Sequence, residues 1–138
     1  MRVFLDANIL LDVLVPRQDP NLALYAMKAI SAARQLEMDL FIATITVPTL
    51  AYVMKGTAEE KKDNLKQFLK NITILDSPAT DVKFAFRSNF KDIEDGMQYS
   101  CAISNNCDLI ITRDMKDFKE SEIMVMTPRQ FLNVIEPD

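Results

Sequence analysis

Three aspartates lie where the sequence predicts the end of a strand or the start of a helix. Asp6 and Asp114 each follow a short apolar run, and Asp95 lies in the first turn of a predicted helix. Parallel strands end at the same edge of a sheet, and ligands bind in crevices at that edge. We therefore expect carboxylates from distant parts of the chain to converge there.

Converging carboxylates repel one another, so a cation is needed to neutralise them. Mg²⁺ and Mn²⁺ take oxygen ligands and retain several waters, and they lower the pKa of bound water and stabilise charge on a phosphoryl oxygen. The chain contains no histidine, which excludes Ser–His and Cys–His catalysis and zinc sites built on imidazole. Any chemistry must rest on carboxylates, hydroxyls, lysines or a metal held by oxygen.

The same acids also have structural interpretations. Asp6 or Asn8 could cap the helix after the first strand, and capping is the preferred interpretation of Asn8. Asp92 could be the N-cap of the later helix, with Asp95 at its third position.

Three more acids are open to similar explanations. Asp114 could cap the short turn that follows it, Glu94 is expected to face solvent, and Asp117 could lie on the surface. Spacing alone leaves both interpretations open.

Composition limits the class of protein. The 138 residues suit one domain, 1–138, and the net charge of −4 is unlike that of most nucleic-acid-binding domains, although a local basic face could still exist. Cys101 and Cys107 match no metal-binding spacing and suggest buried, reduced thiols in a cytoplasmic protein. No signal peptide and no apolar run of about 20 residues is present, so no membrane association is expected.

Strand-like apolar runs alternate with helical patterns along the whole chain. Strands are predicted at 3–5, 40–43, 72–75, 109–112 and 123–126. Helices are predicted at 9–14, 20–36, 47–54, 58–71, 93–104, from 78 and from 128, the first of them ending before Pro16. This alternation implies βαβ units and right-handed crossovers. We predict a three-layer α/β/α sandwich around a mostly parallel five-stranded sheet.

Two of the predicted helices suggest contacts beyond the chain. The helix over 20–36 is apolar on more than one side, which predicts burial against the sheet and against a second copy in a homodimer. The helix over 58–71 carries Lys62, Lys66 and Lys70 on one face. Such a row is most often a solvated surface, and the alternative is a ridge that faces phosphates.

Taken together, these segments resemble the PIN domain. The resemblance rests on Phe4-Leu-Asp-Ala-Asn-Ile-Leu-Leu-Asp12, on Glu94-Asp95 before a small-residue helix, and on Ile111-Thr-Arg-Asp114 with Asp117-Phe118, and it extends to the closing Thr-Pro-x-x-Phe-Leu at 127–132. It implies an α/β/α sandwich and a Mg²⁺- or Mn²⁺-dependent ribonuclease. Small bacterial members of the VapC-like subgroup act as toxins in toxin–antitoxin pairs and form homodimers.

The resemblance assigns the family's acidic set to Asp6, Asp95 and Asp114, and its usual hydroxyl beside the last acid to Thr112. Another acid of the family, a Glu early in the helix after strand two, is absent because Thr49 stands there. A hydroxyl is a weaker ligand, which puts metal affinity and water activation in question. Glu94 could compensate only from a distorted first turn, since adjacent helix residues point about 100° apart.

We therefore expect a metal-dependent endoribonuclease, the toxin of a toxin–antitoxin pair, with RNA as substrate and an antitoxin protein as partner. Asn8 would fix the turn that aims Asp6, and Thr112 would bond a carboxylate or water. Arg113, Lys116 and the lysine row are candidates for backbone contacts. The alternative is a catalytically impaired PIN-like module that binds RNA or a protein partner.

Two other acid-cluster enzyme classes fit the sequence less well. A haloacid-dehalogenase-type phosphotransferase needs a second Asp where this chain has Asn8. A response-regulator receiver needs a Lys at the end of its last strand, where this chain has Met126-Thr127-Pro128.

Overall fold

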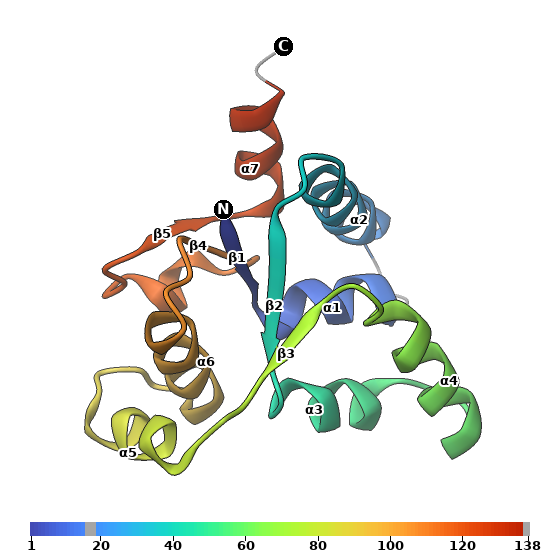
Figure 1. The fold of residues 1–138 in the computed structure, drawn as a ribbon. Coiled ribbons are helices and arrows are strands. Elements are labelled where there is room, and N and C mark those ends of the chain that lie inside the picture. The colour runs from blue at the N-terminus through green and yellow to red at the C-terminus, as the bar shows by residue number, and fades with distance from the viewer. Residues whose placement is uncertain (16–18, 137–138) are drawn as a thin grey trace.

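The computed structural model describes residues 1–15 and 19–136 and contains one five-stranded sheet in the order β3-β2-β1-β4-β5 (Figure 1). The strands are β1 Arg2–Leu5, β2 Asp39–Ala43, β3 Thr73–Leu75, β4 Leu109–Ile111 and β5 Met124–Met126. Each of the four strand pairings is parallel. This arrangement confirms the predicted α/β/α fold and places β1, the strand that delivers Asp6, at the centre of the sheet.

The helices alternate with the strands along the chain. They are α1 Ala7–Leu14, α2 Pro20–Gln35, α3 Thr46–Val53, α4 Ala58–Phe68, α5 Ala79–Arg87, α6 Ile93–Ser104 and α7 Pro128–Ile135, with a short 3-10 helix, η1 Met115–Phe118. In the described residues, none of them is long and apolar enough to cross a membrane.

Local sequence signals explain several helix ends. Asp19 accepts a hydrogen bond from the backbone N–H of Asn21, and Thr57 and Thr127 each form a capping box at the start of α4 and α7.

Two helices end close to their predicted ends. α4 ends at Phe68, earlier than the predicted end near Asn71, whose backbone has the left-handed φ of 71°. Pro16, the expected stop for α1, lies outside the described residues, and α1 ends at Leu14.

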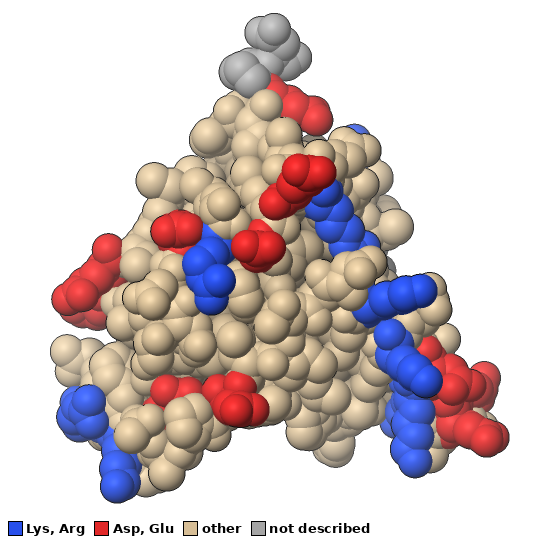
Figure 2. All heavy atoms as spheres, viewed as in Figure 1, with Lys and Arg blue, Asp and Glu red and all other residues tan. Residues whose placement is uncertain are grey.

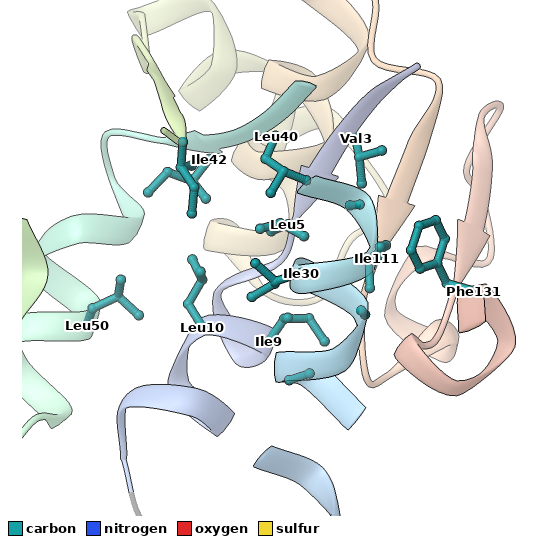
Figure 3. Packing of buried hydrophobic residues seen from close by; sticks show 14 of the residues in the cluster. Val3, Leu5, Ile9, Leu10, Ile30, Leu40, Ile42, Leu50, Ile111 and Phe131 are labelled. Carbon is teal, nitrogen blue, oxygen red and sulfur yellow. The ribbon is translucent and has the colours of Figure 1, made fainter. Parts of the chain in front are cut away.

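Alternating residues of β1 face two separate cores. Val3 and Leu5 pack with side chains from α1, α2, α3, α4 and α7, and this larger core is drawn in Figure 3. Phe4 points to the other face, where α6, η1 and part of α5 cover the sheet. This second core buries the free thiols of Cys101 and Cys107, and burial raises the pKa of Cys101 to about 12.

Helix α2 finds cover within its own chain, since it packs on α1 and α7. Its small residues are buried there, including Ala26, Ala29 and Ala33. Leu24 and Met27 remain 45% and 55% exposed. Most of the apolar surface of α2 that suggested a second copy is therefore buried by other helices of the same chain, and a smaller apolar strip, Leu24 and Met27, stays exposed.

The start of α6 packs against α5 at very short range. A Cβ added at Gly96 would lie 3.0 Å from the Cβ and 3.1 Å from the Cα of Ala85. A side chain at this position would require its neighbours to shift by a few tenths of an ångström, and Gly96 follows Asp95 directly. The spacing of two helices thus fixes the position of a candidate site residue.

We predict that Gly96→Ala lowers the free energy of unfolding by about 1–3 kcal/mol, because the new methyl group overpacks the contact with Ala85. Chemical denaturation followed by circular dichroism measures this change. Ala85→Gly is the matched second substitution, and the double variant should lose less stability than the sum of the single variants. Additive losses would contradict this account of the α5–α6 contact.

Candidate functional site

The carboxylate of Asp6 lies at the junction of β1 and β4. Leu5 pairs with Ile111, and the backbone N–H of Asp6 donates to the carbonyl of Ile111 at 3.0 Å. Thr112 follows β4 and donates its hydroxyl to Asp6 Oδ2 at 2.7 Å, while Gln98 Nε2 donates to Oδ1 at 3.0 Å. Each carboxylate oxygen therefore accepts one hydrogen bond and keeps capacity for another ligand.

Burial dominates the electrostatics of Asp6, whose side chain is only 3% exposed. Desolvation raises its pKa from the ordinary value, although the bonds from Thr112 and Gln98 act in the opposite direction. Asp6 occupies the N-cap position of α1, but within the described residues its side chain makes no capping hydrogen bond, although an interaction with the backbone of Ala7 lowers its pKa. The capping interpretation of Asp6 is therefore wrong.

Asn8 braces the turn that carries Asp6. It lies inside α1, where its Nδ2 donates to Thr112 Oγ1 at 3.3 Å and its Oδ1 accepts the backbone N–H of Arg113 at 3.2 Å. The backbone N–H of Asp114 also donates to Thr112 Oγ1, at 3.1 Å. The preferred capping interpretation of Asn8 is wrong, because the amide links α1 to the segment after β4.

An acidic cavity of about 740 Å³ opens beside this junction. Its walls carry acids and lysines: Asp92, Asp95, Asp114, Asp117, Glu120, Lys91, Lys116 and Lys119. Asp114 and Asp95 line the cavity from opposite elements, the end of β4 and the start of α6. Asp114 precedes η1, and in the described part of the chain its side chain makes no capping hydrogen bond to that turn but interacts with Asp117 instead, so the capping interpretation of Asp114 is also wrong.

Burial and the charges of neighbouring acids act together on Asp95. Burial, followed by the charges of Asp6, Asp92, Asp117 and Glu94, raises its pKa to about 7. Asp92 is the true N-cap of α6, since its Oδ1 accepts the backbone N–H of Asp95 at 3.1 Å. Burial and the neighbouring Asp114 also raise the pKa of Asp117. The acids of this region thus form one electrostatically coupled group.

Glu94 does not simply face solvent, as the sequence suggested. Thr49 of α3 donates its hydroxyl to Glu94 Oε1 at 2.7 Å. Burial raises the pKa of Glu94, the bond from Thr49 lowers it, and the charge of Asp6 raises it further. The hydroxyl at 49 therefore contacts a carboxylate that α6 supplies, and this carboxylate is within electrostatic reach of Asp6.

The basic residues that were predicted to contact the RNA backbone lie at three different places. Lys116 lines the acidic cavity. Arg113 instead pairs with Asp12, whose Oδ2 lies 3.0 Å from the arginine Nε and whose side chain is 2% exposed. Lys62 and Lys66 lie exposed on α4 and Lys70 just beyond it, on a basic edge of the molecule remote from α5 and α6 (Figures 1 and 2).

Gln98 is a site residue that the sequence analysis missed. It is buried, and besides its bond to Asp6 it accepts the backbone N–H of Ala7 at 3.1 Å. Its side-chain amide therefore both caps the first turn of α1 and orients the carboxylate of Asp6. The available signal was its position three residues after Asp95, which puts both side chains on the same face of α6.

The donor set fits a hard divalent cation better than any softer ion. Its ligand atoms are carboxylate and hydroxyl oxygens, and the acids raise one another's pKa in the manner of uncompensated negative charges. In the part of the chain that the structure describes, no three acidic or cysteine side chains form a complete metal-binding group. Mg²⁺ is commonly held by one or two carboxylates and several waters, so a complete protein cage is not required.

Comparison with known proteins gives consistent matches over nearly the whole chain. Residues 2–116 match the family model described as PIN domain. Ribonuclease VapC1 of Aquifex aeolicus (strain VF5) is 28% identical over 136 residues, which cover 94% of this chain and 92% of the relative.

Two solved structures share the fold. VapBC2 from Rickettsia felis, bound to a DNA fragment from its promoter, aligns with a TM-score of 0.65 and 18% identity over 91% of this chain and 97% of the other. A toxin–antitoxin complex from Klebsiella pneumoniae aligns with a TM-score of 0.66 and 20% identity over the same shares, 91% and 97%.

The raised pKa of Asp95 predicts a pH-dependent stability in the absence of divalent ions. The folded protein binds this proton more tightly than the unfolded chain, so the free energy of unfolding should fall as the pH rises from about 4 to about 7. Asp95→Asn should make this fall shallower. Denaturant titrations in EDTA across that range measure it, with exposed Asp63→Asn on α4 as the control. Equal pH slopes in native protein and Asp95→Asn would contradict the raised pKa.

Proposed function

The chain belongs to the PIN domain family, and on this premise we propose that it is a metal-dependent endoribonuclease of VapC type. The observation that carries the proposal is the coupled acidic group at the carboxyl ends of β1 and β4, where Asp6 is held by Thr112 and Gln98. The similarity to Ribonuclease VapC1 over 94% of the chain supports RNA as the substrate class.

The acids have distinct proposed roles. Asp6, Asp95 and Asp114 would hold a Mg²⁺ or Mn²⁺ ion, directly or through water, and Asp117 would add negative charge at the cavity that Asp95 and Asp114 line. Such an ion would lower the pKa of water and stabilise negative charge on the phosphoryl oxygens.

The remaining groups orient these acids. Thr112 and Gln98 fix both oxygens of Asp6, and Asn8 fixes Thr112 in turn. Lys116 lines the same cavity. Its ammonium group is suited to contact the RNA phosphate at which hydrolysis would occur. Glu94 lies in the capped first turn of α6, without the distortion that the sequence required for direct compensation, and it would act from there through its charge near Asp6 while Thr49 orients it.

The second candidate is a PIN-like module that binds RNA or a protein without cleaving it. The observation that favours it is Thr49, a neutral side chain where the family's acidic residue is expected. Only the nuclease candidate cleaves RNA. It requires an ionised Glu94 that is oriented toward the other acids. The nuclease remains the leading proposal because Thr49 donates to Glu94 rather than leaving that position without an acid.

We also propose an antitoxin partner, a homodimer and a cytoplasmic site of action. The solved neighbours include toxin–antitoxin complexes that share this fold. The exposed strip on α2, with Leu24 and Met27, offers an apolar surface for self-association.

Asp6→Asn should reduce RNA cleavage by at least about 100-fold, because it removes a proposed ligand of the ion. Gel assays on a mixed pool of structured RNAs with Mn²⁺ measure the rate, and Asp63→Asn is the control for loss of one carboxylate elsewhere. Unchanged cleavage by Asp6→Asn would overturn the proposed mechanism. Absence of cleavage by native protein, with intact RNA binding, would favour the non-catalytic module.

Thr49→Val should lower the cleavage rate by roughly 10-fold, because it removes a charge-assisted hydrogen bond from Glu94 while keeping the side-chain shape. In a Glu94→Gln background the same substitution should cost little. This double-mutant cycle separates a role through Glu94 from an independent role of Thr49. Fully independent effects would show that Thr49 does not act through Glu94.

The homodimer is tested by replacing its proposed contact. Native protein at micromolar concentration should elute with a light-scattering mass of twice the 15.7 kDa chain, and a Leu24→Glu, Met27→Glu variant should be monomeric because charge opposes apolar burial. Lys62→Glu, at an exposed position on α4 away from this strip, is the control for the added negative charge. A monomeric native protein would refute the dimer.

A further inference from the structure

A second cavity lies next to the acidic one and has no part in the mechanism above. Its volume is about 560 Å³, within the range of ligand-binding pockets. Asn89, Phe90 and Glu120 line both cavities. A ligand in the second cavity would therefore lie directly beside the carboxylates of the first.

Three aromatic residues and an arginine contribute to the lining of this second cavity. The ring centroids of Phe84 and Tyr99 are 5.9 Å apart, and those of Phe90 and Tyr99 are 5.2 Å apart. The guanidinium carbon of Arg87 lies 5.4 Å from the centroid of Phe84. Phe84 and Phe90 are only partly buried, so the cluster retains accessible ring surface.

The rim of the cavity is polar. The residues that line it include Asn89, Ser104, Glu120 and Glu122. Stacking surfaces with hydrogen-bonding groups at their edges suit a flat ligand with a polar perimeter. Aromatic rings and arginine planes stack the unpaired bases of single-stranded RNA in this way, and carboxylates accept bonds from exocyclic amino groups.

We propose that this cavity is a nucleobase subsite, which takes a base of single-stranded RNA adjacent to the phosphodiester in the acidic cavity. The proposal rests on the proposed nuclease function and deepens it. Phe90 lies at the boundary, because it contributes to both cavities and also contacts Phe118 of η1 with a centroid distance of 5.8 Å. Glu120 and Glu122 favour a base that carries an exocyclic amine, which adenine, cytosine and guanine do and uracil does not.

α5 supplies a matched pair of phenylalanines for the test. Phe84 lines the cavity, whereas Phe86 on the same helix is 70% exposed and is absent from its lining. Leu substitution removes an aromatic face at either position and keeps most of the apolar volume. Arg87→Gln removes the guanidinium from an exposed site and serves as a second variant if Phe84→Leu unfolds.

The measurement is fluorescence anisotropy with labelled ten-residue oligoadenylate, oligocytidylate and oligouridylate. It uses an Asp95→Asn background in EDTA, so that binding is read without cleavage. Phe84→Leu and Arg87→Gln should each weaken oligoadenylate binding by roughly 5- to 150-fold, the range for loss of one stacked base. Phe86→Leu should leave binding unchanged, and oligouridylate should bind most weakly.

Cleavage by the same variants with Asp95 intact separates the possible failures. If native protein cleaves RNA and the cavity variants bind it normally, the nucleobase subsite is wrong and the nuclease stands. An equal loss in Phe86→Leu also overturns the subsite, because the effect is then not confined to the cavity. If native protein neither binds nor cleaves RNA, both proposals fall.

Discussion

The carboxylate of Asp6 is the constraint on which the rest of the site depends. A charged group at 3% exposure is costly unless it is hydrogen-bonded. Thr112 from the end of β4 and Gln98 from α6 supply those bonds at 2.7 and 3.0 Å. The solvation of one side chain therefore requires β1, β4 and α6 to meet at a fixed distance.

The neighbouring acids follow from the same geometry. Once α6 is placed to bring Gln98 to Asp6, its first turn carries Glu94 and Asp95 toward the same edge of the sheet. Their charges then add to that of Asp6, and burial with this repulsion raises the pKa of Asp95 to about 7. The close contact of Gly96 with Ala85 holds this end of α6 against α5. A divalent cation would relieve the repulsion, and this is the physical basis of the proposed activity.

The sequence was sufficient for the fold and for the location of the acids. Apolar runs ending in Asp6 and Asp114 predicted two strands ending at one edge, because that inference needs only chain order and the parallel rule. It was insufficient for side-chain partners. The preferred role of Asn8 was capping, yet its amide reaches Thr112, about a hundred positions away. The Thr49–Glu94 bond joins α3 to α6, and no local pattern encodes such a contact. Gln98 was missed although its position three residues after Asp95 placed it on the same face of α6, because that position does not identify Asp6 as its partner.

Mn²⁺ binding by calorimetry tests the central claim most directly. The account predicts that native protein binds the ion more tightly at about pH 8 than at about pH 6, because the proton on Asp95 competes with the metal. It also predicts that Asp95→Asn loses this binding, whereas Asp63→Asn keeps it. Native protein that takes up no Mn²⁺ at millimolar concentration, or an Asp95→Asn variant that binds it equally well, would contradict the account.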